Sequence, residues 1–137
     1  LVGNAGLLLT RVEYLKHTTH RDFAIVDAAM NDLPRPAMYQ AFHQIVPLSP
    51  RVGATTLVDV VGPVCESGDW IGRDRQLNVQ AGDTLAVLSA GAYCMSMSSN
   101  YNTRGRAAEV LIDGDQVHLI RKRETAADTF QGEHLVP

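Results

Sequence analysis

The chain has 137 residues, the length of one ordinary domain; 45% of them are hydrophobic and 20% are charged. This composition is typical of a globular domain that buries its own core, and it excludes a disordered chain. Twelve Lys and Arg residues against fifteen Asp and Glu residues leave a formal net charge of -3, so we expect no nucleic-acid partner and no membrane partner.

Cys65 and Cys94 are the two cysteines, and they form neither a CxxC pair nor a dense disulfide framework. Because secreted disulfide scaffolds are rich in cysteine, we expect a reducing, cytoplasmic compartment. The sequence begins at Leu1 rather than Met and enters a strand pattern almost at once. We therefore expect residues 1–137 to be a single β-domain cut from a longer polypeptide.

The first predicted elements are two strands and a stiff turn. β-branched and aromatic residues predict strands at residues 12–15 and 23–26, joined by a polar loop as an antiparallel hairpin or a meander corner. Pro34 and Pro36 flank Arg35, and each proline restricts the residue before it. We therefore expect an extended backbone at Arg35.

The rest of the chain predicts more strands and no sustained helical periodicity. These strands lie at residues 42–46, 55–61, 85–88, 108–112 and 116–121. Asp113-Gly114 between the last two is a strong hairpin signal. A short helix capped by Thr125 is predicted over residues 125–132. Short strands separated by turns indicate an all-β barrel or sandwich with minor short helices.

Three short segments carry side chains that could serve a ligand. Cys65 and Glu66 lie in a glycine-containing loop that can present a thiol and a carboxylate, although a packing cysteine in an ordinary turn is the simpler interpretation. Arg35 and Tyr39 suit a carboxylate, or equally a surface salt bridge. Tyr93 follows small residues that let the backbone approach another group, a pattern also common in ordinary β turns.

Other classes of site lack their main parts. His17 and His20 resemble a metal-ligand spacing, but zinc needs three or four converging ligands, so we predict no metal site. The sequence contains no GxSxG, GxxxxGK[ST] or GxGxxG motif, which argues against a nucleophile-elbow hydrolase and a nucleotide-binding loop.

Taken together and in this order, the three segments resemble the C-terminal domain of meso-diaminopimelate decarboxylases. These enzymes belong to the fold-type III, alanine-racemase-like decarboxylases that use pyridoxal 5'-phosphate (PLP). The resemblance covers essentially the whole chain, through motifs at residues 2–6, 10–14, 27–32, 35–39, 61–69, 89–93, 97–104 and 123–125.

The resemblance implies an N-terminal (β/α)8 barrel, outside this chain, that carries the lysine holding PLP. It implies that this β-domain completes the active site and much of a homodimer interface. By resemblance, Cys65 is the catalytic proton donor and Glu66 a substrate contact, both reaching into the partner subunit's site. Arg35 and Tyr39 match substrate-binding positions, and Tyr93 matches a residue that contacts both PLP and substrate.

The implied reaction is PLP-dependent decarboxylation of meso-2,6-diaminopimelate to L-lysine and CO2, the last step of lysine biosynthesis. An ordinary thiol stays mostly protonated at neutral pH, so Cys65 can deliver a proton to Cα. One alternative is a decarboxylase of the same fold acting on ornithine or arginine, against which Arg35 argues because those substrates carry no distal carboxylate. The other alternative is a catalytically silent homologue that only binds partners. We expect the isolated chain to be inactive in either case.

Overall fold

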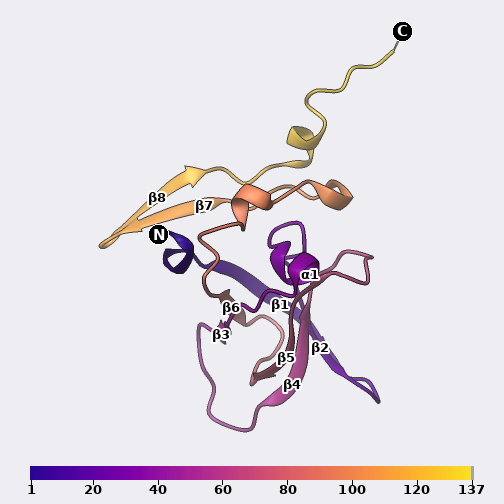
Figure 1. The fold of residues 1–137 in the computed structure, drawn as a ribbon, viewed down its shortest axis with the longest axis vertical. Helices are drawn as coiled ribbons and strands as arrows, with labels where there is room; N and C mark the ends of the chain where they lie inside the picture. The colour runs from indigo at the N-terminus through magenta and orange to yellow at the C-terminus, as the bar shows by residue number, and fades with distance from the viewer. Residues whose placement is uncertain (137) are drawn as a thin grey trace.

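The computed structural model describes residues 1–136, and their core is a six-stranded sheet that curls into a nearly closed barrel (Figure 1). Its strands are β1 (Leu8–Lys16), β2 (Asp22–Val26), β3 (Ile45–Pro47), β4 (Thr56–Val61), β5 (Trp70–Leu77) and β6 (Thr84–Val87). Their spatial order is β3-β6-β1-β2-β4-β5, and the outermost strands β3 and β5 also contact each other. The prediction of an all-β barrel or sandwich is confirmed, and the sheet is barrel-like.

Alternating burial along the strands builds the core of this barrel. In β1 the side chains of Leu8, Thr10 and Val12 are buried and those between them are exposed. Successive side chains of a strand point to opposite faces, so one face of each strand fills the barrel and the other meets solvent. The largest fully buried aliphatic residues, which form its centre, are Val12, Val26, Leu33, Val60, Ile71, Leu85 and Val87.

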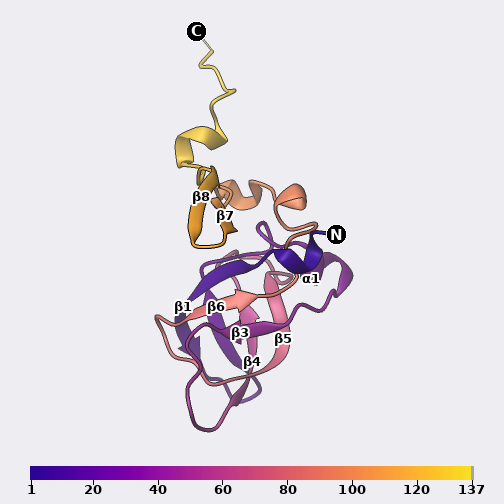
Figure 2. The same ribbon diagram turned by 90° about the vertical axis from the view of Figure 1, so that its left-hand side faces the viewer.

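Both predicted hairpins are confirmed. β1 pairs with β2 in antiparallel register, with Leu15 opposite Ala24. β7 (Glu109–Asp113) pairs with β8 (Gln116–Arg121) around Gly114, whose φ of 62° is one that glycine adopts without steric cost. The β7–β8 hairpin forms a separate two-stranded sheet above the barrel (Figures 1 and 2).

The prediction of an extended backbone at Arg35 is wrong. Arg35 is the first residue of α1 (Arg35–Tyr39), and Pro34 caps this helix with φ −76° and ψ −19°. Proline fits the first turn of a helix because its fixed φ is helical and its missing N–H has no partner to lose there. The two prolines therefore start a helix instead of preventing one.

Other elements also differ from the predictions. The strand expected from residue 42 begins only at Ile45, and the terminal helix is a short 3-10 turn, η4 (Ala126–Thr129), although its expected cap at Thr125 is present. β5 was not predicted, because Asp74 has a φ of 54° and the register against β4 shifts nearby. Such a bulge breaks the alternation by which a strand is recognised.

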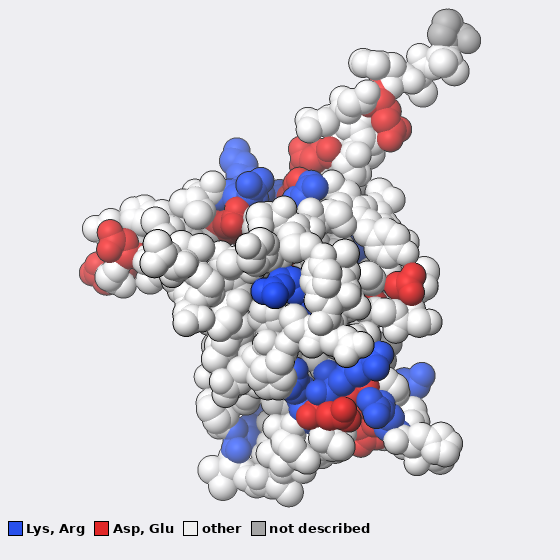
Figure 3. Space-filling view, viewed as in Figure 1, with Lys and Arg blue, Asp and Glu red and all other residues white. Residues whose placement is uncertain are grey.

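Three further 3-10 turns complete the described chain: η1 (Gly3–Ala5), η2 (Met95–Met97) and η3 (Tyr101–Thr103). None of the helices in residues 1–136 has the length and apolar character needed to cross a bilayer. On the face drawn in Figure 3, positive and negative side chains lie close together between wide uncharged areas.

Candidate functional site

The structure brings two of the three predicted segments into direct contact. The guanidinium carbon of Arg35 lies 5.3 Å from the centre of the Tyr93 ring, in a cation–π arrangement. Arg35 starts α1, and Tyr39 lies four residues later, which places both on one side of the short helix. Tyr39 and Tyr93 are each 58% exposed. Arg35 and Tyr93 are thus in contact, and Tyr39 shares a side of α1 with Arg35; the three residues are called here the arginine–tyrosine cluster.

Tyr93 is held in an uncommon conformation. Its φ of 61° lies in the left-handed region, as does the φ of 58° of Ser89 at the start of the same loop. Non-glycine residues in this region are often found at functional sites, where the surrounding structure enforces the strain. An exposed phenol that is held in this way is available to a ligand.

The small residues before Tyr93 do permit a close approach, and the group that approaches is the chain's own N-terminal segment. The Ala90 N–H donates to the Gly6 carbonyl over 2.8 Å, and the Gly91 N–H donates to the Gly3 carbonyl over 3.0 Å. A Cβ on Gly91 would overlap the carbonyl of Val2. The segment around η1 therefore supports the loop that carries Tyr93.

Cys65 and Glu66 form a second cluster in the loop of residues 62–69, which connects β4 to β5. Both side chains are exposed. The Tyr101 hydroxyl donates to Glu66 Oε2 over 3.3 Å, and the negative charge of Glu66 raises the pKa of Tyr101. Within residues 1–136, the Glu66 carboxylate accepts hydrogen bonds from the Gly68 N–H and the Tyr101 hydroxyl, and none from the arginine–tyrosine cluster. The predicted site residues thus divide into two groups.

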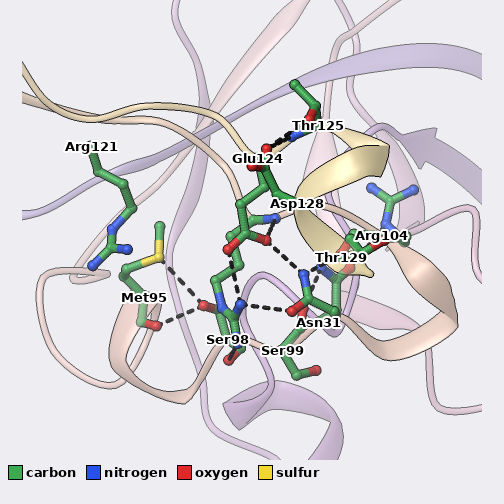
Figure 4. Close-up of polar contacts among 12 residues, drawn as sticks. Asn31, Met95, Ser98, Ser99, Arg104, Arg121, Glu124, Thr125, Asp128 and Thr129 are labelled. Atoms are coloured by element: carbon green, nitrogen blue, oxygen red, sulfur yellow. Dashed lines mark hydrogen bonds and ion pairs between the residues drawn. The ribbon is translucent and has the colours of Figure 1, made fainter. Parts of the chain in front are cut away.

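Tyr101 is a site neighbour to which the sequence analysis assigned no role. It lies in η3, far along the chain from Glu66, and its place depends on a network that ties this part of the chain to the barrel (Figure 4). The Arg104 side chain donates to Asn31 Oδ1 over 2.9 Å and to the Asp27 carbonyl over 2.6 Å. No local pattern signals such a contact, because it depends on residues distant in sequence.

Glu124 anchors the other side of the same network (Figure 4). Its carboxylate accepts the Arg106 N–H over 2.8 Å, the Asn100 amide over 2.6 Å and the Arg106 guanidinium over 3.0 Å. These bonds lower the pKa of Glu124 to about 2, and the bond from the Arg106 backbone N–H has the largest effect. The chain entering β7 and the chain leaving β8 are joined here.

Cys94 is less accessible than Cys65, whose side chain is exposed. It is half-buried, packs against the core, and its Sγ lies 3.2 Å from the Asp32 carbonyl. Burial, with the charges of Asp32 and Glu109, raises the pKa of Cys94 to about 12. A thiol of this kind is inert near neutral pH, so Cys65 is the cysteine available for chemistry.

Known proteins of one family are similar to this chain. The family model of the C-terminal sheet domain of pyridoxal-dependent decarboxylases matches residues 2–91. The diaminopimelate decarboxylase of Pseudomonas aeruginosa is 62% identical over 137 residues, which are 100% of this chain and 33% of that protein. The enzyme of the same name from Vibrio cholerae is 56% identical over 137 residues, again 100% of this chain and 33% of the relative.

A solved structure shares the fold as well as the sequence. The diaminopimelate decarboxylase of M. jannaschii, in complex with L-lysine, is 44% identical with a TM-score of 0.93, and the match covers 98% of this chain and 31% of that one. The chain therefore spans about a third of the length of the relatives it matches.

Proposed function

Because the chain belongs to the pyridoxal-dependent decarboxylases, whose C-terminal sheet domain it matches over residues 2–91, we propose that it is the C-terminal β-domain of a diaminopimelate decarboxylase. The complete enzyme would release CO2 from meso-2,6-diaminopimelate and form L-lysine. The observation that carries this proposal is the 62% identity over the whole chain to an enzyme of that name.

Arg35 supports the choice of substrate. Within residues 1–136 its guanidinium stacks on Tyr93 and makes no ion pair, so its N–H groups remain available to a ligand. A guanidinium fork binds a carboxylate through two parallel hydrogen bonds. Diaminopimelate carries a carboxylate at its far end, and ornithine and arginine do not. The geometry therefore favours a substrate with a distal carboxylate.

The absence of hydrogen bonds between the two clusters within residues 1–136 supports a shared active site. We place Arg35, Tyr39 and Tyr93 at the site of their own subunit, and Cys65 with Glu66 at the site of the partner in a homodimer. Tyr101 orients the Glu66 carboxylate, which would bind the distal ammonium of the substrate. The N-terminal barrel, outside this chain, would supply the lysine that holds PLP.

The residues present fit PLP as a cofactor. Tyr93 offers an exposed ring and a hydroxyl on a strained, well-supported loop, which suits contact with a planar cofactor. When bound, PLP delocalises the electron pair left on Cα by the departing CO2. Cys65 would hold a proton for Cα. By holding this proton at Cα, Cys65 would favour lysine over an aldehyde product.

We also place the enzyme in the cytoplasm. Both cysteines are free thiols in the structure. Free thiols suit a reducing compartment, where disulfides rarely persist.

The test compares substrates with the full-length enzyme. Purified enzyme with PLP is given diaminopimelate, ornithine or arginine, and CO2 and the amine products are measured. We expect lysine from diaminopimelate and far slower turnover of the other two, and no CO2 from the 137-residue chain alone. Preference for ornithine or arginine would favour the basic amino-acid decarboxylase, and no turnover of any substrate would favour a silent homologue.

A further inference from the structure

Asp69 is a buried carboxylate that binds two backbone segments at once. Its side chain lies directly before β5, and the residue is 4% exposed. Oδ2 accepts the Val64 N–H and Oδ1 accepts the Met30 N–H, each over 2.7 Å. Val64 precedes Cys65 in the β4–β5 loop, whereas Met30 belongs to the segment that leads into α1. One carboxylate thus joins the segments that carry the two clusters.

The β4–β5 loop is built around this carboxylate. A Cβ on Gly62 would lie 2.5 Å from Asp69 Oδ2 and 2.7 Å from Oδ1, so glycine is needed for the carboxylate to fit. The Gly62 N–H donates to the Asp69 carbonyl over 3.1 Å, and the Asp69 N–H donates to the Glu66 carbonyl over 3.0 Å. The residues on both sides of Cys65 are therefore held by Asp69.

Burial of the Asp69 carboxylate is unfavourable unless hydrogen-bond donors compensate for the lost solvent. Loss of solvent raises the pKa of Asp69, while the bonds from the Met30 and Val64 N–H groups act in the opposite direction. Two donors aimed at a buried carboxylate are what such a group requires. Without these two hydrogen bonds the β4–β5 loop would be free to move, and the exposed Cys65 thiol would occupy many positions.

We propose that Asp69 is a positioning residue that fixes the Cys65–Glu66 loop relative to the segment leading to Arg35. Proton delivery to one face of one carbon depends on the position of the donor. The inference rests on the proposed role of Cys65, which Asp69 itself does not touch.

The first measurement tests the hydrogen bonds themselves. In the full-length enzyme, Asp69→Asn keeps the side-chain volume but replaces one acceptor oxygen with an amide group, so one backbone N–H loses its partner. We expect amide hydrogen exchange to become about tenfold faster in residues 28–33 and 62–69, with β4 and β5 unchanged. Unchanged exchange in both segments would overturn the proposal.

Asp83→Asn is the matched control. Asp83 accepts the Gln80 N–H over 2.9 Å and two bonds from Arg51, so it also joins a turn to a second segment. It lies in the turn after the other end of β5, away from the β4–β5 loop. We expect Asp83→Asn to leave exchange in residues 62–69, and turnover of diaminopimelate, at wild-type values.

The second measurement separates positioning from general stability. Asp69→Asn should lower kcat for diaminopimelate about tenfold, raise the ratio of aldehyde to lysine, and leave PLP binding unchanged. In a Cys65→Ala background the same change should cost less than about twofold, because the donor it positions is gone. If the two substitutions lower kcat by factors that multiply in the double variant, the role of Asp69 is merely structural. An unchanged ratio of aldehyde to lysine in Asp69→Asn would show the same.

Two further arms keep the test decisive. If Asp69→Asn does not fold, Gly62→Ala displaces the carboxylate while retaining its charge, and it should produce the same exchange pattern and the same product ratio. If the wild-type enzyme releases no CO2 from diaminopimelate, the proposed function fails, and the exchange measurement still decides whether Asp69 holds the loop.

Discussion

The guanidinium of Arg35 lies over the ring of Tyr93, with 5.3 Å between its central carbon and the ring centre. The helix that carries Arg35 and the strained loop that carries Tyr93 come from opposite halves of the chain. A cation–π contact at an exposed site contributes about 0.5–1 kcal/mol, enough to bias the direction of a long side chain. The stacking thus aims the guanidinium before any substrate arrives.

Arg35→Lys in the full-length enzyme should reduce kcat/KM for diaminopimelate more than it weakens PLP binding. Lysine keeps the positive charge but loses the two-pronged fork that matches a carboxylate. The expected loss is about 1–3 kcal/mol in transition-state binding, measured by steady-state kinetics beside PLP titration. Arg51→Lys, at an exposed pair with Asp83, is the control. A kcat/KM that hardly moves would assign the substrate carboxylate to another residue.

Cys65→Ala should slow lysine formation and divert some turnovers to the aldehyde, so that the enzyme loses activity as it works. The reason is that no donor then lies over Cα to decide where the proton goes. Lysine, aldehyde and remaining activity are followed together, with Cys94→Ala as the thiol control. Lysine formation at the wild-type rate without aldehyde would make Cys65 a packing residue.

Mixed dimers test whether Cys65 acts across the subunit interface. One subunit carries Cys65→Ala and the other lacks the barrel lysine that holds PLP. One intact site should then form from the lysine of the first subunit and the thiol of the second. Recovery of activity well above that of either parent dimer is expected. Absence of recovery would place Cys65 in the site of its own subunit.

Tyr101→Phe should raise KM for diaminopimelate with little change in kcat. The change removes only the hydroxyl that donates to Glu66 Oε2 over 3.3 Å. Loss of one such bond costs about 0.5–1.5 kcal/mol, which corresponds to a KM increase of about two- to tenfold. Tyr14→Phe, at an exposed position of β1, is the control. A fall in kcat at constant KM would mean that Tyr101 serves the chemical step instead.

Glu124→Gln should remove a pH-dependent part of the stability of the full-length enzyme. The bond from the Arg106 N–H, with those from Asn100 and the Arg106 side chain, lowers the pKa of Glu124 from 4.5 to about 2. A depressed carboxyl pKa stabilises the folded state above the unfolded pKa, and this stabilisation is lost as pH falls through the folded pKa. Unfolding midpoints of wild type and variant should therefore differ at pH 7 and converge between about pH 4.5 and pH 2. Glu133→Gln, in the exposed C-terminal segment, is the control and should leave the unfolding midpoint at pH 7 at the wild-type value.

Local signals in the sequence are sufficient to predict many strands of the fold and to identify the candidate site residues. Asp113-Gly114 predicts its hairpin because the turn and its flanking strands are adjacent in the chain, and the strand at residues 55–61 is recognisable from its β-branched run. The motifs around Cys65, Arg35 and Tyr93 suffice for the family, since they depend on residue types and order alone.

The tertiary structure decided everything that depends on distant partners. β2 pairs in parallel with β4. The connection between them, which contains α1 and β3, returns the chain to the end of the sheet at which β2 began. The bulge at Asp74 interrupts the alternation by which β5 could be recognised in the sequence. The helix at Arg35 forms where local proline rules predict an extended backbone. The burial of Asp69 likewise appears only in the fold. Propensities describe the sterics of neighbouring residues, whereas the contacts of Arg35 with Tyr93, Glu66 with Tyr101 and Asp69 with Met30 exist only after the barrel has closed.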